Sequence, residues 1–177
     1  MWKKFLPIVC FIILLLLLLS RFDVFPKPPM SEDEKTAAAY VESHGYKIEG
    51  REGKAFTYIL DKSRLNSEAA SASGNLPYIQ IWGLQENDPE NYFGKEISTY
   101  AFTVSGHPLD KQYNTHTRVT IMMVDGEVVG GTSFPEAKEE GLLLTGWPYG
   151  LDGRTLEEIT GLSYAEWSVE WARKYND

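Results

Sequence analysis

The N-terminal twenty residues divide the chain into two parts with different physical requirements. After the basic start Met1-Trp2-Lys3-Lys4, fifteen residues from Phe5 to Leu19 carry no charge. As a helix this run would be about 22 Å long, short of the roughly 30 Å hydrocarbon thickness of a bilayer. Apolar residues on both sides can lengthen it, with Trp2 at the interface. The sequence therefore predicts one transmembrane helix, a signal anchor, over residues 1–21.

A cleaved signal peptide is the main alternative to this anchor. Cleavage favours small residues at positions −3 and −1, and only Ser20 is small where the run ends. A lipoprotein is disfavoured because Cys10 precedes most of the apolar run. Lys3 and Lys4 give a modest positive-inside bias. We expect a single-pass cell-membrane protein with its C-terminal domain outside; the alternative is secretion after signal cleavage.

A stalk and one domain follow the anchor. In residues 22–30, Pro26, Pro28 and Pro29 favour an extended, polyproline-type conformation and prevent the helix from continuing. The remaining residues, 31–177, have the usual length of a single domain. We predict that this is an extracytoplasmic domain.

Charge and cysteine content exclude several classes of function. Four of the 17 basic and one of the 25 acidic residues lie in residues 1–30, which leaves 13 basic against 24 acidic residues. A surface this negative repels phosphate backbones, so we expect no nucleic-acid partner. Cys10 is the single cysteine, so the domain has no disulfide, no cysteine-bound metal and no thiol nucleophile. No cofactor is predicted.

Capping boxes predict the helices. Ser31 to Glu34 begins a helix that runs to about residue 44, where Gly45 ends it. Two more boxes, at Thr155–Glu158 and Ser163–Glu166, begin a short helix ending at Gly161 and a final helix. In that final helix, four aromatic residues share one face by their spacing: Tyr164, Trp167, Trp171 and Tyr175.

Alternating apolar residues predict antiparallel strands. Strands are expected at 46–49 and 55–60 around a turn at 50–53, and at 78–82 and 97–104; the polar stretch 61–75 is expected to be a loop or a frayed helix. Asp125-Gly126 predicts a type I′ hairpin over 117–132. Its register would place Met123 opposite Val128, Ile121 opposite Gly130 and Thr120 opposite Gly131.

These elements predict an α+β domain. It would have an N-terminal helix, an antiparallel sheet of five to six strands and C-terminal helices. A helix packed across a curved sheet, as in cystatins, is one specific form of this arrangement.

Two residue groups are candidates for a functional site. Trp147, Tyr149 and Asp152 lie in a glycine-flanked loop, where aromatic rings can present flat faces to sugars or peptides. Alternatively, these rings close the open end of the sheet. His107, Asp110 and His116 form the best polar cluster and could bind zinc or act as acid and base. Their spacing matches no metal motif, so we favour a structural role, with His107 and Asp110 satisfying loop backbone groups.

Four stretches resemble a known family: residues 81–85, 92–95, 106–110 and 151–158. They read IWGLQ, YFGK, GHPLD and LDGRTLEE. They are similar to a family of small Bacillus-type envelope proteins that carry a domain of unknown function, the one numbered 4830. The resemblance covers most of residues 31–177 and implies a Gram-positive surface location. It implies no activity, cofactor or catalytic residue.

Two functional hypotheses follow. The first is a membrane-tethered extracytoplasmic binding module of the cell envelope, which would use the loop of Trp147 and Tyr149 to bind an envelope protein or a cell-wall polymer. The second is a hydrolase or metal-dependent enzyme that uses His107, Asp110 and His116. The sequence favours the first, because it has no G-x-S-x-G nucleophile motif and no metal-ligand spacing.

Overall fold

The computed structural model describes residues 28–68, 76–137 and 146–176. The predicted anchor and the first stalk residues, 1–27, lie outside this part of the chain. Pro28, Pro29 and Met30 are exposed and belong to no helix. Among the described residues, no helix combines the length and the apolar character that crossing a bilayer requires.

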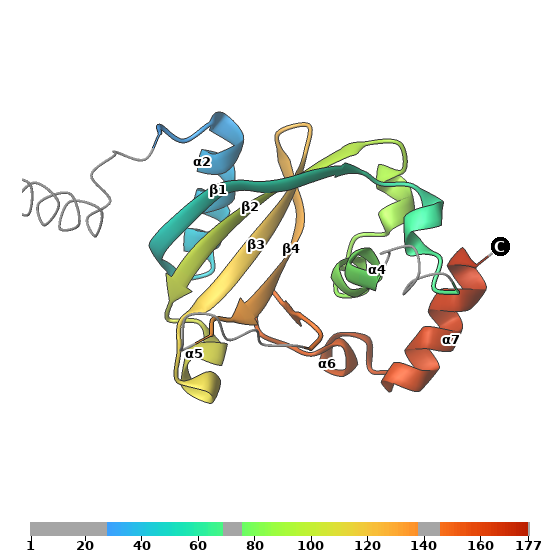
Figure 1. The fold of residues 1–177 in the computed structure, drawn as a ribbon. Helices are drawn as coiled ribbons and strands as arrows, with labels where there is room; N and C mark the ends of the chain where they lie inside the picture. Colours follow the sequence, from blue (N-terminus) through green and yellow to red (C-terminus); the bar gives the residue numbers. More distant parts are fainter. Residues whose placement is uncertain (1–27, 69–75, 138–145, 177) are drawn as a thin grey trace, which may run out of the picture.

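The centre of the domain is an antiparallel sheet of five strands, which confirms the predicted α+β class (Figure 1). The strands lie in sequence order: β1 (Lys47–Ile59), β2 (Glu96–Ser105), β3 (Thr117–Val124), β4 (Glu127–Pro135) and the two-residue β5 (Tyr149–Gly150).

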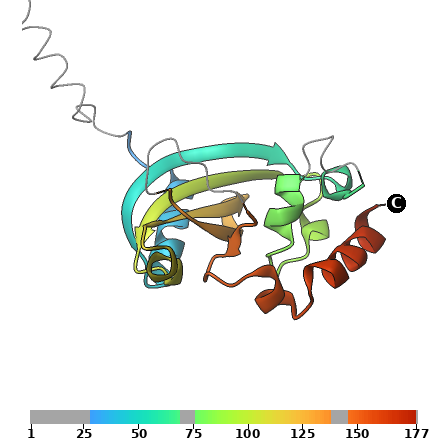
Figure 2. The same ribbon diagram turned by 60° about the horizontal axis from the view of Figure 1, so that its bottom comes forward.

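Helices lie on both sides of this sheet. Helix α2 (Glu32–Ser43) packs on one face, whereas α4 (Leu76–Trp82), α6 (Leu156–Thr160) and α7 (Tyr164–Tyr175) lie toward the other (Figure 2). Two hydrophobic clusters result, because the sheet separates them. One joins α2 to the sheet through Ala37, Val41 and Phe102. The other joins the opposite face to α4 and α7 through Trp82 and Trp171.

Two of the three predicted capping boxes, those at α6 and α7, form completely; at α2 the Ser31 half forms, while the Glu34 carboxylate pairs with Arg51. Ser31 Oγ accepts a hydrogen bond from the Glu34 backbone N–H at the start of α2. Thr155 and Ser163 make reciprocal boxes at α6 and α7, and Gly161 ends α6 in the left-handed conformation. Each box satisfies backbone donors that the first turn of a helix leaves unpaired.

The Asp125-Gly126 hairpin is also confirmed, but its register is only partly as predicted. Both turn residues have positive φ, as a type I′ turn requires. Met123 lies opposite Val128, as expected. A bulge then shifts the pairing by one residue, so Ile121 pairs with Gly131 and Thr120 with Thr132.

The predicted hairpin at 46–60 is wrong, because this segment is the single long strand β1. Its turn-forming residues lie within the strand and shift its register against β2 between Ile48 and Gly50 and between Arg51 and Gly53. Gly53 takes a positive φ, which a bulge uses as readily as a turn does. Strand β2 pairs with the segments on both sides of these glycines and therefore holds them in one strand.

The strand predicted at 78–82 is wrong as well, because this segment is helix α4. Ile79 and Trp82 are both buried and are three residues apart, which places them on one face of a helix. Over five residues this spacing is hard to distinguish from strand alternation. The neighbouring stretch 61–68 includes a short 3₁₀ helix, η2 (Lys62–Leu65), and residues 69–75 lie outside the described part.

Side chains rather than a strand cover part of the outer edge of β4. Gln85 Oε1 accepts from the Gly131 backbone N–H at 2.9 Å, and Gln85 Nε2 donates to the Gly131 carbonyl at 3.2 Å. Asn87 Nδ2 donates to the Val129 carbonyl. These amides supply the partners that a neighbouring strand would otherwise provide.

The chain then passes through the 3₁₀ helix η3 (Pro89–Tyr92) and continues into β2.

Candidate functional site

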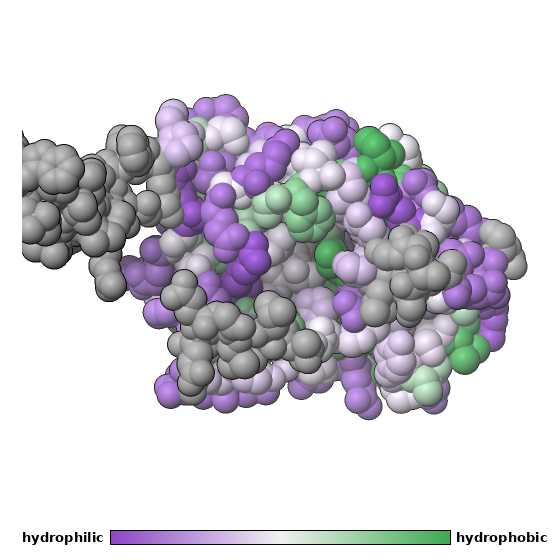
Figure 3. Space-filling view, viewed as in Figure 1, coloured by the Kyte–Doolittle hydropathy of each residue, from purple (hydrophilic) through white to green (hydrophobic). Residues whose placement is uncertain are grey.

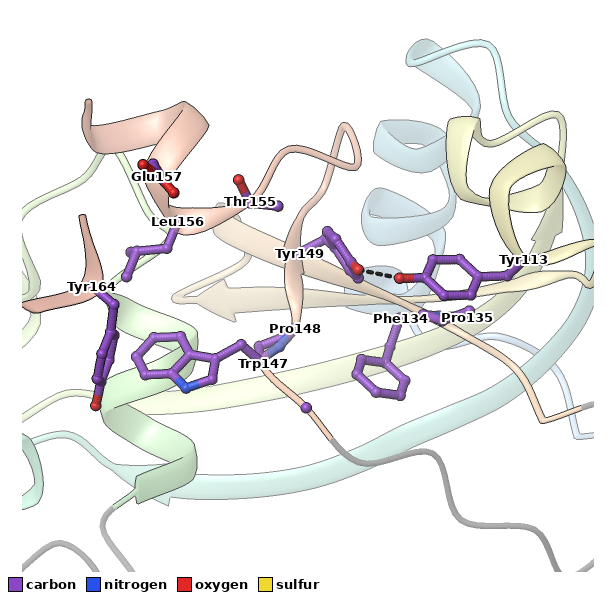
Figure 4. Close-up of a pocket in the computed structure, with 11 residues that line it drawn as sticks. Tyr113, Phe134, Pro135, Trp147, Pro148, Tyr149, Thr155, Leu156, Glu157 and Tyr164 are labelled. Atoms are coloured by element: carbon purple, nitrogen blue, oxygen red, sulfur yellow. Dashed lines mark hydrogen bonds between the residues drawn. The ribbon is translucent and has the colours of Figure 1, made fainter. Parts of the chain in front are cut away.

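The candidate site is a largely apolar pocket of about 560 Å³ between the β4–β5 side of the sheet and the start of α6 and α7 (Figure 4). The face of the domain that Figure 3 shows is mainly hydrophilic, with a few separate hydrophobic patches. Aromatic rings and prolines form most of its described lining: Tyr113, Phe134, Pro135, Trp147, Pro148, Tyr149 and Tyr164.

Trp147 is held from one side by the aromatic face of α7. Its ring meets Tyr164 edge to face at 5.2 Å and Trp167 at 5.4 Å between centroids. Trp167 is buried and packs in turn on Trp171, as the helical spacing predicts. Edge-to-face pairs of this kind are favourable beyond their buried area, so Trp147 occupies a fixed position at the pocket.

The opposite wall carries a pair of hydroxyl groups. Tyr149 in β5 and Tyr113 at the end of α5 (Pro108–Tyr113) form a hydrogen bond between their hydroxyls (Figure 4). This bond and partial burial raise the pKa of Tyr149 to about 12. Its hydroxyl therefore stays protonated at neutral pH.

The described lining of the pocket carries little charge, and that charge is negative. Glu157 is the single charged residue among the described lining residues, and its side chain is exposed. The lining therefore disfavours anions and accepts neutral or cationic groups.

Asp152, which the sequence grouped with Trp147 and Tyr149, belongs to a different hollow. It lines a smaller, more polar pocket of about 270 Å³ beside Gln85 and His44. Partial burial works to raise the pKa of Asp152, but hydrogen bonds from the Arg154 backbone N–H and guanidinium outweigh it and hold the pKa below its ordinary value. Asp152 thus has an internal partner, and the predicted three-residue site is divided.

His107 and Asp110 form the N-terminal cap of α5. His107 Nδ1 accepts from the Leu109 backbone N–H at 3.1 Å, and Asp110 Oδ2 accepts from the His107 backbone N–H at 3.1 Å. The other oxygen of Asp110 accepts from the Thr117 hydroxyl. His107 Nε2 lies 2.9 Å from the Leu151 carbonyl, so the neutral tautomer with hydrogen on Nε2 satisfies both contacts. The cap is the structural role expected from the sequence.

His116 does not extend this pair into a site. It is exposed just before β3, whereas the His107 side chain is buried. The described residues contain no group of three or more His, Cys, Asp or Glu placed to hold a metal ion. The enzyme hypothesis therefore gains no support from this cluster.

The buried His107 leads to a pH prediction. Burial lowers its pKa below the ordinary value of 6.5, although the Leu151 carbonyl and the charges of Asp110 and Asp152 partly oppose the shift. The unfolded chain then binds more protons than the folded chain just below pH 6.5. The stability contributed by neutral His107 is complete above that pH and is lost as the pH falls through the folded-state pKa.

Unfolding free energies measured between pH 7.5 and 5 test this expectation. We expect His107→Asn, which keeps a cap-forming side chain, to flatten the loss of stability across that range. Replacing the exposed His116 by Asn serves as the matched control. An equal slope in the His107→Asn protein and the unmodified chain would contradict the prediction.

Sequence reasoning missed much of the pocket wall. Phe134 and Pro135 end β4, and Tyr113 ends α5, so the fold rather than chain proximity brings them to Trp147. The spacing puts Tyr164 on the same face of α7 as Trp167 and Trp171, yet Tyr164 is 56% exposed whereas the two tryptophans are buried. That exposed aromatic ring beside Trp147 is the signal that marks the pocket.

Searches against protein-family models, curated proteins and solved structures find no match to this chain. The resemblance to the envelope family and the cystatin-like arrangement stay predictions.

Proposed function

We propose that this chain is a membrane-tethered extracytoplasmic binding module of the cell envelope. It would bind an envelope protein or a cell-wall polymer in the aromatic pocket without catalysing a reaction. The observation that carries the proposal is the pocket itself, in which Trp147, Tyr149 and Tyr164 line one apolar hollow. Concave, mostly apolar sites with a few polar groups are where ligands bind most often.

The proposed tether rests on the sequence. The uncharged run from Phe5 to Leu19 and the proline-containing stalk place the domain outside the membrane in this proposal. The mass of the mature chain tests it: retention of residues 1–21 supports an anchor, and their loss supports secretion. The packing of α2 on one sheet face supports the cystatin-like arrangement, which is part of the same proposal.

Co-purification from the membrane of the protein's own cells tests the binding function. We expect Trp147→Ala to remove most of the specifically bound material, because it deletes the central ring of the pocket. His116→Ala is the matched control, since His116 is exposed and outside the pocket. Unchanged binding by Trp147→Ala, or a loss caused by His116→Ala instead, would contradict the proposal.

A further inference from the structure

The hydrogen-bonding groups of the pocket restrict what it can bind. Two hydroxyl hydrogens belong to Tyr113 and Tyr149, and their mutual hydrogen bond uses one of them. This pair leaves one O–H donor for a ligand, and the Tyr164 hydroxyl, which has no hydrogen-bond partner among the described residues, is another. The indole N–H of Trp147 has no acceptor among the described residues, in contrast to Trp82 and Trp171, whose indoles donate to Tyr58 and Leu65.

The pocket therefore offers donors beside apolar rings and favours a ligand rich in acceptors. A proline-rich segment in the polyproline II conformation has this chemistry. Its carbonyls project outward, it has few N–H groups to satisfy, and its rings pack on aromatic side chains. A glycan also stacks on aromatic rings, but it brings many hydroxyl donors that need acceptors when buried, and the side chains of the described lining offer few beyond the Glu157 carboxylate and the phenol oxygens.

The charge at the rim adds a second requirement. The Glu157 carboxylate has no hydrogen-bonding or ion-pair partner among the described residues, whereas that of neighbouring Glu158 is engaged by the Thr155 cap. No cation occurs in the described lining. A ligand with Lys or Arg beside its prolines would pair with Glu157 and would also be attracted by the acidic domain.

We infer that the aromatic pocket binds a basic, proline-rich polypeptide segment in the polyproline II conformation. The inference rests on the proposed function and names the ligand class for the same pocket. In it, Trp147 and Phe134 receive proline rings, Trp147 Nε1 and the free tyrosine hydroxyls donate to ligand carbonyls, and Glu157 pairs with the basic side chain.

Calorimetric titration of the full-length chain in detergent with an acetylated, amidated peptide, PPKPPKPP, tests the inference. We expect saturable binding that Trp147→Ala weakens at least tenfold. The double variant Tyr113→Phe/Tyr149→Phe, which removes both hydroxyls and keeps both rings, should weaken it by a smaller factor. Val169→Ala is the matched control, because Val169 is exposed on α7 and lies outside the pocket.

A second peptide isolates the role of charge. Replacing both lysines by glutamine should weaken binding to the unmodified chain about two- to fivefold, the range of an exposed ion pair. Glu157→Gln should weaken the lysine peptide to a similar extent and leave the glutamine peptide unchanged. Because Glu157 is exposed, this variant tests the inference even if Trp147→Ala fails to fold.

Three results would overturn the inference. They are no binding of the lysine peptide, binding that Glu157→Gln and Tyr113→Phe/Tyr149→Phe both leave unchanged, and Trp147-dependent binding of an N-acetylglucosamine oligomer in place of the peptide. The last result would keep the proposed function and change its ligand class. Failure of the proposed function itself is read separately, from co-purification with Trp147→Ala.

Discussion

Replacement of Trp82 by alanine should lower the free energy of unfolding by about 3–5 kcal/mol, the usual cost of deleting a large buried aromatic side chain. Trp82 is only 1% exposed and lies in the cluster between the sheet and α7. Its Nε1 donates to the Tyr58 hydroxyl at 2.9 Å, and that hydroxyl lies against the sulfur of Met122. The substitution removes both the packing and the hydrogen bond. Urea unfolding of the full-length chain, followed by circular dichroism, measures the effect.

Two controls separate packing from hydrogen bonding. Trp82→Phe keeps much of the apolar volume and loses the indole N–H, so we expect a smaller loss of about 1–2 kcal/mol. Val169→Ala, at an exposed position of α7, should change the free energy by less than about 0.5 kcal/mol. Equal unfolding midpoints for Trp82→Ala and Val169→Ala would show that the described core is incorrect.

Replacement of Gly83 by alanine should destabilise the fold by about 1–3 kcal/mol, the range for overpacking. A Cβ at this position would lie 2.5 Å from Cζ2 of Trp167 and 3.0 Å from the Ile79 carbonyl oxygen. Neither atom can move easily, since one belongs to a buried ring and the other to backbone. Because Trp167 supports Trp147, the same substitution should also weaken ligand binding in the pocket.

Gly50→Ala provides the matched control for that substitution. A Cβ there would lie 3.4 Å from Cβ of Thr103, an ordinary contact, and Gly50 does not have positive φ. We expect its free energy of unfolding to change by less than about 1 kcal/mol. If Gly50→Ala is as destabilising as Gly83→Ala, close approach of Trp167 to Gly83 does not explain the glycine at 83.

The helix caps and the tight hairpin could be predicted because their chemistry is local. Ser31, Thr155 and Ser163 need only a partner three residues away, and Asp125-Gly126 needs only two positive φ angles. Long strand β1 and helix α4 depend on distant partners instead. Strand β2 holds the glycines of β1 in bulges, and the core around Tyr58 holds Trp82 in a helix.

The same difference between local and distant contacts explains why only part of the pocket could be predicted from the sequence. Trp147 and Tyr149 could be predicted from their local sequence, because aromatic residues flanked by glycines in a loop can present their rings to a ligand. Tyr113 and Phe134 approach them only after β4 and β5 pair through Thr132 and Ser133. Asp152 was grouped with them by chain proximity, yet β5 and the following turn place it in a different pocket.

Site-specific photo-crosslinking in the protein's own cells tests the central claim most directly. A photoreactive amino acid replaces either Tyr164 or Val169, which lie on the same helix and are similarly exposed, at 56% and 59%. Tyr164 lines the pocket and Val169 does not. We expect a defined adduct from position 164, its loss when Trp147→Ala is added, and none from position 169. Equal adducts from both positions, or an adduct at 164 that survives Trp147→Ala, would contradict a binding function for this pocket.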